Sequence, residues 1–200
     1  CEILNDDGSM ARLPDLLKFS KKHEIKIGTI ADLIEYRSKK EKLIKKISEE
    51  KVNTEFGMMK LIVYSDLLSK NTHLAFVKGE IEKDDEVVVR VHEPLSILDF
   101  VSKETPHSWP PLKALKKISN EKNGVVIFLN YNESQNNITS KLNHENISLK
   151  KSTDLRSYGI GSQILVDIGI SKMKLLAAPR KMPSMIGYGL QVTEFIENDI

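Results

Sequence analysis

Short apolar runs that alternate with helical stretches constrain the fold of this 200-residue chain more than any other feature. From residue 54 onward, three strand-like runs come first, each bounded by turn-forming residues, at 58–64, 73–78 and 87–92. Helices and strands are then expected in alternation, at 112–118, 125–129, 157–168, 173–177 and 190–196. This order of elements predicts an α/β or α+β fold.

The first 37 residues carry two amphipathic helical patterns, at 13–23 and 30–37, and a short strand is expected between them at 25–28. Thr29 precedes Asp32 by three residues, which is the spacing of a capping box at a helix start. We therefore expect residues 1–37 to form a small unit of their own.

Lys and Glu dominate the stretch that follows, and Leu43, Ile44 and Ile47 recur within it at helical spacing. This pattern predicts a solvated, charged linker helix over 38–53. The change of pattern at Val52 places the domain boundary there, so that 54–200 is expected to be the main domain.

Cysteine occurs once, at position 1, although 40% of the residues are apolar. A single thiol excludes internal disulfides and any zinc site with two sulfur ligands from one chain. A net charge of +2 gives no electrostatic case for binding nucleic acid or a membrane surface, and no apolar run reaches the ~18 residues needed to cross a bilayer. We expect a cytoplasmic protein because disulfides are absent. We also read the chain as beginning within a longer protein.

Residues 1–12 and 29–37 closely resemble the C-terminal end of 3,4-dihydroxy-2-butanone 4-phosphate synthase. The resemblance implies a parent enzyme that converts ribulose 5-phosphate to dihydroxybutanone phosphate and formate with magnesium or manganese. Glu2 matches the catalytic glutamate of that family, and a carboxylate near the sugar carbons can move protons. The rest of that site would lie upstream, so that Glu2 is inert by itself in this chain.

The remainder resembles GTP cyclohydrolase II, and the resemblance implies a mixed-sheet domain. It rests on residues 54–57, 73–81, 89–92, 154–165, 167–170, 172–176 and 187–190. The combined pattern resembles a bacterial subgroup of fused riboflavin-biosynthesis proteins whose cyclohydrolase half is degenerate; residues 107–109 and 179–185 are typical of that subgroup. Because both families are commonly dimeric, we expect a homodimer.

Three cysteines hold zinc in the cyclohydrolase family, after the segment that matches Arg90 and His92, and all three are absent here. The five histidines lack the i, i+2 or i, i+4 spacing of ligand pairs, so we expect no metal site and no zinc. The GTP-contacting segment also lacks its arginines and glycines at 130–137, a following stretch is missing, and Ala177 and Ala178 replace polar residues of the family.

Asp154 and Arg156 match the family's proton acceptor and nucleophilic arginine. The alternative is that Asp154 caps a helix and pairs with Arg156. Arg90 and His92 match its triphosphate contacts and could bind GTP or phosphate, the alternative being an arginine on a solvated strand end.

We therefore expect a synthase of riboflavin biosynthesis whose cyclohydrolase-like domain is structural or regulatory. The alternatives are an active GTP cyclohydrolase II and a nucleotide or phosphate sensor without turnover.

Overall fold

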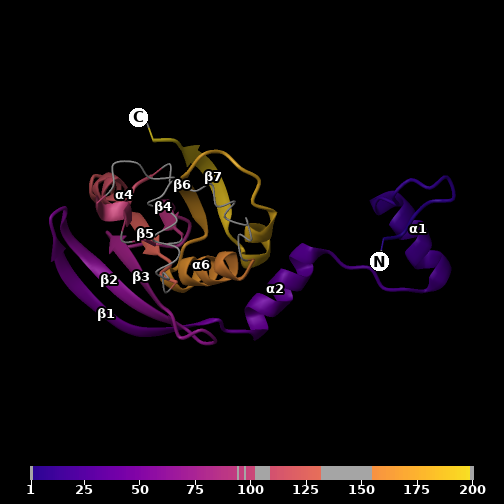
Figure 1. The fold of residues 1–200 in the computed structure, drawn as a ribbon, viewed down its shortest axis with the longest axis horizontal. Helices are drawn as coiled ribbons and strands as arrows, with labels where there is room; N and C mark the ends of the chain where they lie inside the picture. The colour runs from indigo at the N-terminus through magenta and orange to yellow at the C-terminus, as the bar shows by residue number, and fades with distance from the viewer. Residues whose placement is uncertain (1, 94, 97, 102–108, 132–154, 199–200) are drawn as a thin grey trace.

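The computed structural model describes residues 2–93, 95–96, 98–101, 109–131 and 155–198. These residues form a seven-stranded mixed sheet with helices on its two faces, and an N-terminal segment extends away from the sheet (Figure 1). The predicted α/β class is confirmed. Within the described ranges, no helix has the length and apolar character that a membrane span requires.

The sheet has the strand order β1-β2-β3-β5-β4-β6-β7. Its strands are β1 (Ile44–Thr54), β2 (Gly57–Asp66), β3 (Thr72–Lys78), β4 (Glu86–His92), β5 (Gly124–Phe128), β6 (Lys172–Leu176) and β7 (Gln191–Ile196). The first three strands and β5 pair antiparallel in that order, whereas β4 pairs parallel with both β5 and β6, and β6 pairs parallel with β7. The described helices are α1 (Leu13–His23), α2 (Ile30–Lys40), α3 (Leu98–Val101), α4 (Pro111–Ser119), α6 (Leu155–Ile168) and the 3-10 helix η1 (Pro183–Tyr188).

Side chains of the central strands alternate between two apolar layers. On one face Ile160 and Ile164 of α6 pack with Val89 of β4, and on the other face Ile118 of α4 packs with Val88. Both layers consist of fully or almost fully buried aliphatic side chains, and this burial is the main stabilising term of the domain. Helices α4 and α6 therefore hold β4 and β5 at the centre of the sheet.

The N-terminal segment has sound local structure but almost no core. Helix α2 begins at a capping box in which the Asp32 amide donates to the Thr29 hydroxyl at 3.0 Å, as its sequence predicts. Helix α1 contains no buried residue, and Leu13 and Leu17 remain more than half exposed. Helix α1 lies beyond α2, at the end of the molecule that is farthest from the sheet (Figure 1).

The predicted linker helix over 38–53 is wrong. Helix α2 ends at Lys40, and β1 begins at Ile44 and pairs with β2 from Ile44↔Asp66 to Thr54↔Gly57. The side chains of β1 are mostly exposed on both faces of an edge strand, so polar residues are tolerated at nearly every position and no two-residue alternation remains in the sequence. The pairing with β2 overrides the local helical pattern.

The other predicted elements of the main domain that fall within the described residues are confirmed to within a few residues. The strand expected at 25–28 is wrong, because these residues belong to no strand and connect α1 to α2. Of the segment 130–137, which the resemblance matches to GTP contacts, the structure describes only the first two residues.

Candidate functional site

The carboxyl ends of β4 and β5 mark the point where the chain leaves neighbouring parallel strands toward opposite faces of the sheet. The segment after β4 leads to α4, and the segment after β5 leads to α6 on the other face. Ligands of open α/β sheets bind at such points, because the two departing loops leave a crevice between them. Arg90 and His92, two of the residues singled out in the sequence, both belong to this end of β4.

Arg90 is buried rather than solvated, so the alternative of an arginine on a solvated strand end is wrong. Its side chain is only 6% exposed, and Nη1 donates to the carbonyl oxygen of Leu176 at the end of β6, at 2.8 Å. The Nε of Arg90 is also buried and has no hydrogen-bond partner within the described part of the chain. Burial, reinforced by the positive charge of Arg180 and only partly opposed by Asp99, lowers the pKa of Arg90 to about 10.

His92 makes a buried hydrogen bond with Asp99 of α3. Its Nε2 lies 2.9 Å from Oδ2 of Asp99, and the same carboxylate oxygen accepts a hydrogen bond from the backbone amide of Ser96 at 2.8 Å. All three residues are buried. Burial lowers the pKa of His92, although Asp99 and a backbone hydrogen bond with Trp109 act in the opposite direction. The ring of His92 is therefore neutral at pH 7.

Trp109 closes this end of the sheet from the side of α4. Its indole Nε1 donates to the carbonyl oxygen of Ile196 at the end of β7, at 2.9 Å, and its ring belongs to the apolar layer under α4. Arg180 follows β6 in the chain, and its guanidinium carbon lies 5.9 Å from the centre of the Tyr158 ring on α6. Two arginines thus flank the carboxyl end of β4, one buried and one exposed.

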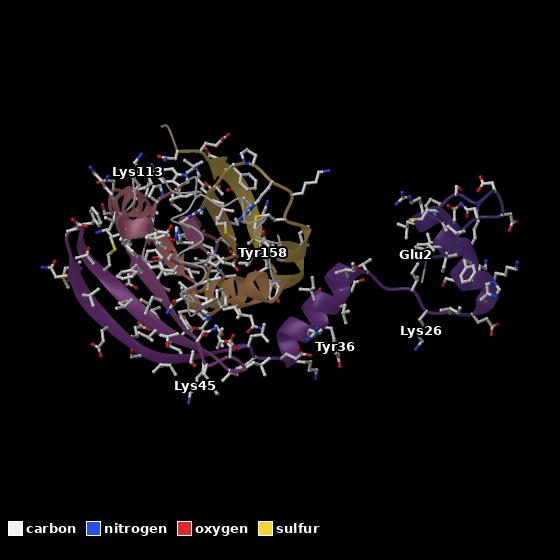
Figure 2. All side chains as sticks on the ribbon, viewed as in Figure 1. Glu2, Lys26, Tyr36, Lys45, Lys113 and Tyr158 are labelled. Carbon is white, nitrogen blue, oxygen red and sulfur yellow. The ribbon has the colours of Figure 1, made fainter. Side chains whose placement is uncertain are left out.

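Of the remaining predicted site residues, the structure describes the side chain of Glu2 alone, and it does not bring Glu2 together with Arg90 and His92. Arg156 lies in the first turn of α6, but its side chain is outside the described set, as is the whole of Asp154. Glu2 is exposed and lies in the N-terminal segment, far from the sheet and from Tyr158 (Figure 2). The proposed capping of α6 by Asp154 therefore stays a prediction.

Sequence reasoning missed Asp99, Trp109 and Arg180 as parts of this site. Arg180 was available as a signal, because it follows the end of a predicted strand, where ligand contacts of α/β folds gather. Asp99 gave no signal, because its partner His92 is seven residues away and the intervening chain has no regular period.

The comparisons with known proteins decide the family. The model of GTP cyclohydrolase II matches residues 45–197, which is most of the chain. The chain belongs to the GTP cyclohydrolase II family. The model of 3,4-dihydroxy-2-butanone 4-phosphate synthase matches residues 1–36.

Relatives of this cyclohydrolase-family chain are named either as the synthase or as a riboflavin biosynthesis protein. The 3,4-dihydroxy-2-butanone 4-phosphate synthase of Neisseria meningitidis serogroup B is 44% identical over 98% of this chain and 54% of that protein. The riboflavin biosynthesis protein RibBA of Aquifex aeolicus is 39% identical over 97% of this chain and 52% of that protein. The chain thus spans about half the length of these relatives.

A solved structure can be aligned with nearly the full length of this chain. The two-domain synthase RibBX of A. baumannii is 33% identical, with a TM-score of 0.55 over 99% of this chain and 53% of that one. The family match begins at residue 45, close to the start of β1, so β1 is part of the cyclohydrolase-like domain.

The residues after His92 do not fit the three-thiolate zinc site that the family resemblance implies. No cysteine is present anywhere beyond Cys1, and among the described side chains at the end of β4, the Nε2 of His92 and the carboxylate of Asp99 are hydrogen-bonded directly to each other. Across the described ranges, no three His, Cys, Asp or Glu residues are grouped so that they could hold a metal ion. No zinc-dependent step can be derived from this site.

Proposed function

We propose that this chain is the C-terminal part of a riboflavin-biosynthesis protein whose working activity is 3,4-dihydroxy-2-butanone 4-phosphate synthase. Support comes from the synthase match at residues 1–36 and from relatives about twice as long. The substrate would be ribulose 5-phosphate, and Glu2 would move a proton during enolisation. Magnesium or manganese, held by residues outside this chain, would stabilise the negative charge of the enolate.

We propose further that the cyclohydrolase-like domain has no zinc and no GTP hydrolase activity, and that its role is structural or regulatory. The absence of cysteine beyond Cys1 carries this proposal, and the hydrogen bond between His92 and Asp99 supports it, because it engages two described side chains at the end of β4 that could otherwise bind a metal. The family's chemistry needs a metal-bound water as the nucleophile, and no thiolate is available to hold that metal.

Metal analysis combined with a GTP turnover assay tests this proposal. We expect less than about one-tenth equivalent of zinc per chain, and no formate release from GTP. Stoichiometric zinc together with formate release would establish the competing function, an active GTP cyclohydrolase II. Synthase turnover of the full protein, with and without residues 44–200, then measures the support that the domain gives; identical rate and stability would remove the structural role.

A second candidate function is the binding of GTP or phosphate without turnover. It is favoured by Arg90, whose buried Nε has no partner in the described part of the chain, and by the second positive charge at Arg180. Guanidinium groups at the carboxyl ends of parallel strands suit phosphate oxygens. Calorimetric titration with GTP, pyrophosphate and ribulose 5-phosphate separates a sensor from an inert scaffold.

The matched variants for this titration are Arg180→Gln and Lys113→Gln. Arg180 is exposed at the site, whereas Lys113 is exposed on α4, so only the first should weaken anion binding, by about five- to tenfold. Equal affinities of the two variants would contradict the anion site.

For the full protein we also propose a homodimer, and sedimentation of the purified protein checks this oligomeric state. We further propose a cytoplasmic location and no nucleic-acid or membrane partner.

A further inference from the structure

The joint between the N-terminal segment and the sheet domain is short and tightly held. Helix α2 ends at Lys40 and β1 begins at Ile44, so only Glu41, Lys42 and Leu43 connect them. The connection runs beside α6, and α2 lies against η1 (Figure 1). Next to it is a groove of ≈ 860 Å³ that residues of α2, β1, α6 and η1 line together. The sheet domain and α2 therefore share one continuous surface.

One side chain of α6 binds the connection at two backbone positions. The Oε1 of Gln163 accepts a hydrogen bond from the backbone amide of Leu43 at 2.8 Å. Its Nε2 donates to the backbone carbonyl oxygen of Glu41, also at 2.8 Å. A single amide group thus satisfies a donor and an acceptor of the connection, and it fixes two peptide groups relative to α6.

Three further contacts hold two residues of the connection, Leu43 and Glu41. The carbonyl oxygen of Leu43 accepts a hydrogen bond from the backbone amide of Leu67, at 2.8 Å. The side chain of Leu43 reaches Gly159 of α6, where an added Cβ would lie 3.2 Å from its Cδ1 and 3.0 Å from the Tyr188 hydroxyl. Glu41 is anchored on the other side by Arg37 of α2, whose Nη2 lies 2.7 Å from its carboxylate.

We propose that Gln163 is a positioning residue that locks the synthase tail onto the cyclohydrolase-like domain, so that α2 and α6 move as one body. The geometry of the joint stands by itself; the statement that α2 belongs to a synthase rests on the proposed function. Lys- and Glu-rich connections are ordinarily solvated and mobile. Here, each peptide group between Lys40 and Ile44 makes at least one hydrogen bond, through the amides or carbonyls of Glu41 and Leu43. The lock holds α2, most of which lies within the synthase match at residues 1–36, against the cyclohydrolase-like domain.

Limited proteolysis of the full chain tests the lock. Lys42, Lys45 and Lys46 are tryptic sites within or next to the joint, and they are cut only when the backbone opens. Because Gln163→Leu removes both hydrogen bonds at similar side-chain size, we expect cleavage here, and exchange of the Leu43 amide, to rise about 10- to 100-fold. Gln191→Leu is the matched control, since Gln191 is exposed on β7 and does not contact the joint; its cleavage rate should equal that of the unmodified protein.

A second variant keeps the test decisive if Gln163→Leu does not fold. Gln163→Glu retains an oxygen that accepts from Leu43 but loses the amide that donates to Glu41, so its cleavage rate should be intermediate. Equal cleavage in Gln163→Glu, Gln191→Leu and the unmodified protein would overturn the lock. This result is independent of the assigned activity, because a protein without synthase turnover can still show the lock, and an active synthase can still lack it.

Discussion

The Nε2 of His92 and the Oδ2 of Asp99 lie 2.9 Å apart at the carboxyl end of β4, closed off from solvent. Asp99 also accepts the backbone amide of Ser96, so one carboxylate ties the strand end to the segment that leaves it. The contact between His92 and Asp99 therefore links α3 to the end of β4. It occupies the place where the family resemblance would put a metal and its thiolates.

Asp99→Asn should destabilise the domain by about 1–3 kcal/mol, because one carboxylate oxygen contacts both His92 and the Ser96 amide, and the amide of Asn cannot match both contacts equally. Equilibrium unfolding in urea measures the change. Asp84→Asn is the control, because the Asp84 side chain is 66% exposed and its contact with Lys172 is a surface pair. An Asp99→Asn protein as stable as the control would show that the contact does not hold the segment.

Stability should fall as the pH drops below about 6.5, through the titration of His92. Burial lowers the pKa of His92 in the folded protein from its usual 6.5, so the unfolded chain takes up the proton first. The stabilisation is therefore complete above the unfolded pKa and is lost progressively as the pH falls toward the folded pKa.

Unfolding curves between about pH 7 and pH 5 check the sign of this dependence. His92→Gln should flatten the slope in this window, whereas His23→Gln should not, because His23 is exposed on α1. The carboxylates with lowered pKa values, such as Glu49 and Glu86, titrate below this window and do not obscure the result. A slope that survives in His92→Gln would assign the pH dependence to another group.

Tyr64→Phe should cost about 1–2 kcal/mol, because the hydroxyl of this buried tyrosine donates to Asp167 of α6 at 2.7 Å. The bond links β2 to the end of the helix, and together with burial it raises the pKa of Tyr64 far above its usual value. Thermal unfolding of Tyr64→Phe and of the exposed control Tyr36→Phe measures the difference. Equal unfolding temperatures would mean that the bond exchanges freely with water.

Gly124→Ala should destabilise the domain by about 1–3 kcal/mol through overpacking. An added Cβ at Gly124 would lie 2.5 Å from the Cβ of Ile118, so α4 would have to shift away from β5. Gly28→Ala is the matched control, because nothing lies within 4 Å of its added methyl group. In an Ile118→Ala background, Gly124→Ala should cost less than it does in the unmodified protein; an equal cost would place the strain elsewhere. Chemical denaturation of the unmodified protein and of the three single variants and the double variant decides the outcome.

Local signals were enough to predict the helices and most of the strands. The Thr29–Asp32 capping box and the apolar period of α6 depend on neighbours within one or two turns, so the sequence alone predicts them. Strand β1 could not be predicted this way, because its partner β2 supplies the pairing and solvent covers both of its faces. The cyclohydrolase-like domain consequently begins earlier than the pattern change at Val52 suggests.

The candidate site was predicted only in part, for a similar reason. Arg90 and His92 are adjacent members of one motif, and the structure places both at the same strand end. Their environment depends on contacts across the sheet, from the Leu176 carbonyl to Arg90 and from Asp99 to His92, which no local spacing encodes. The burial of Arg90 follows from the neighbouring strands, and only a three-dimensional structure reveals it.

The charged residues of β1 have one more consequence. An edge strand presents unpaired backbone groups to any extended chain that approaches, and long apolar edges recruit further strands into aggregates. Lys45, Lys46, Glu49, Glu50 and Lys51 surround this edge with charges that another strand would have to desolvate. The charged composition that suggests a helix in the sequence therefore also hinders the addition of further strands to this long sheet edge, and with it fibril formation.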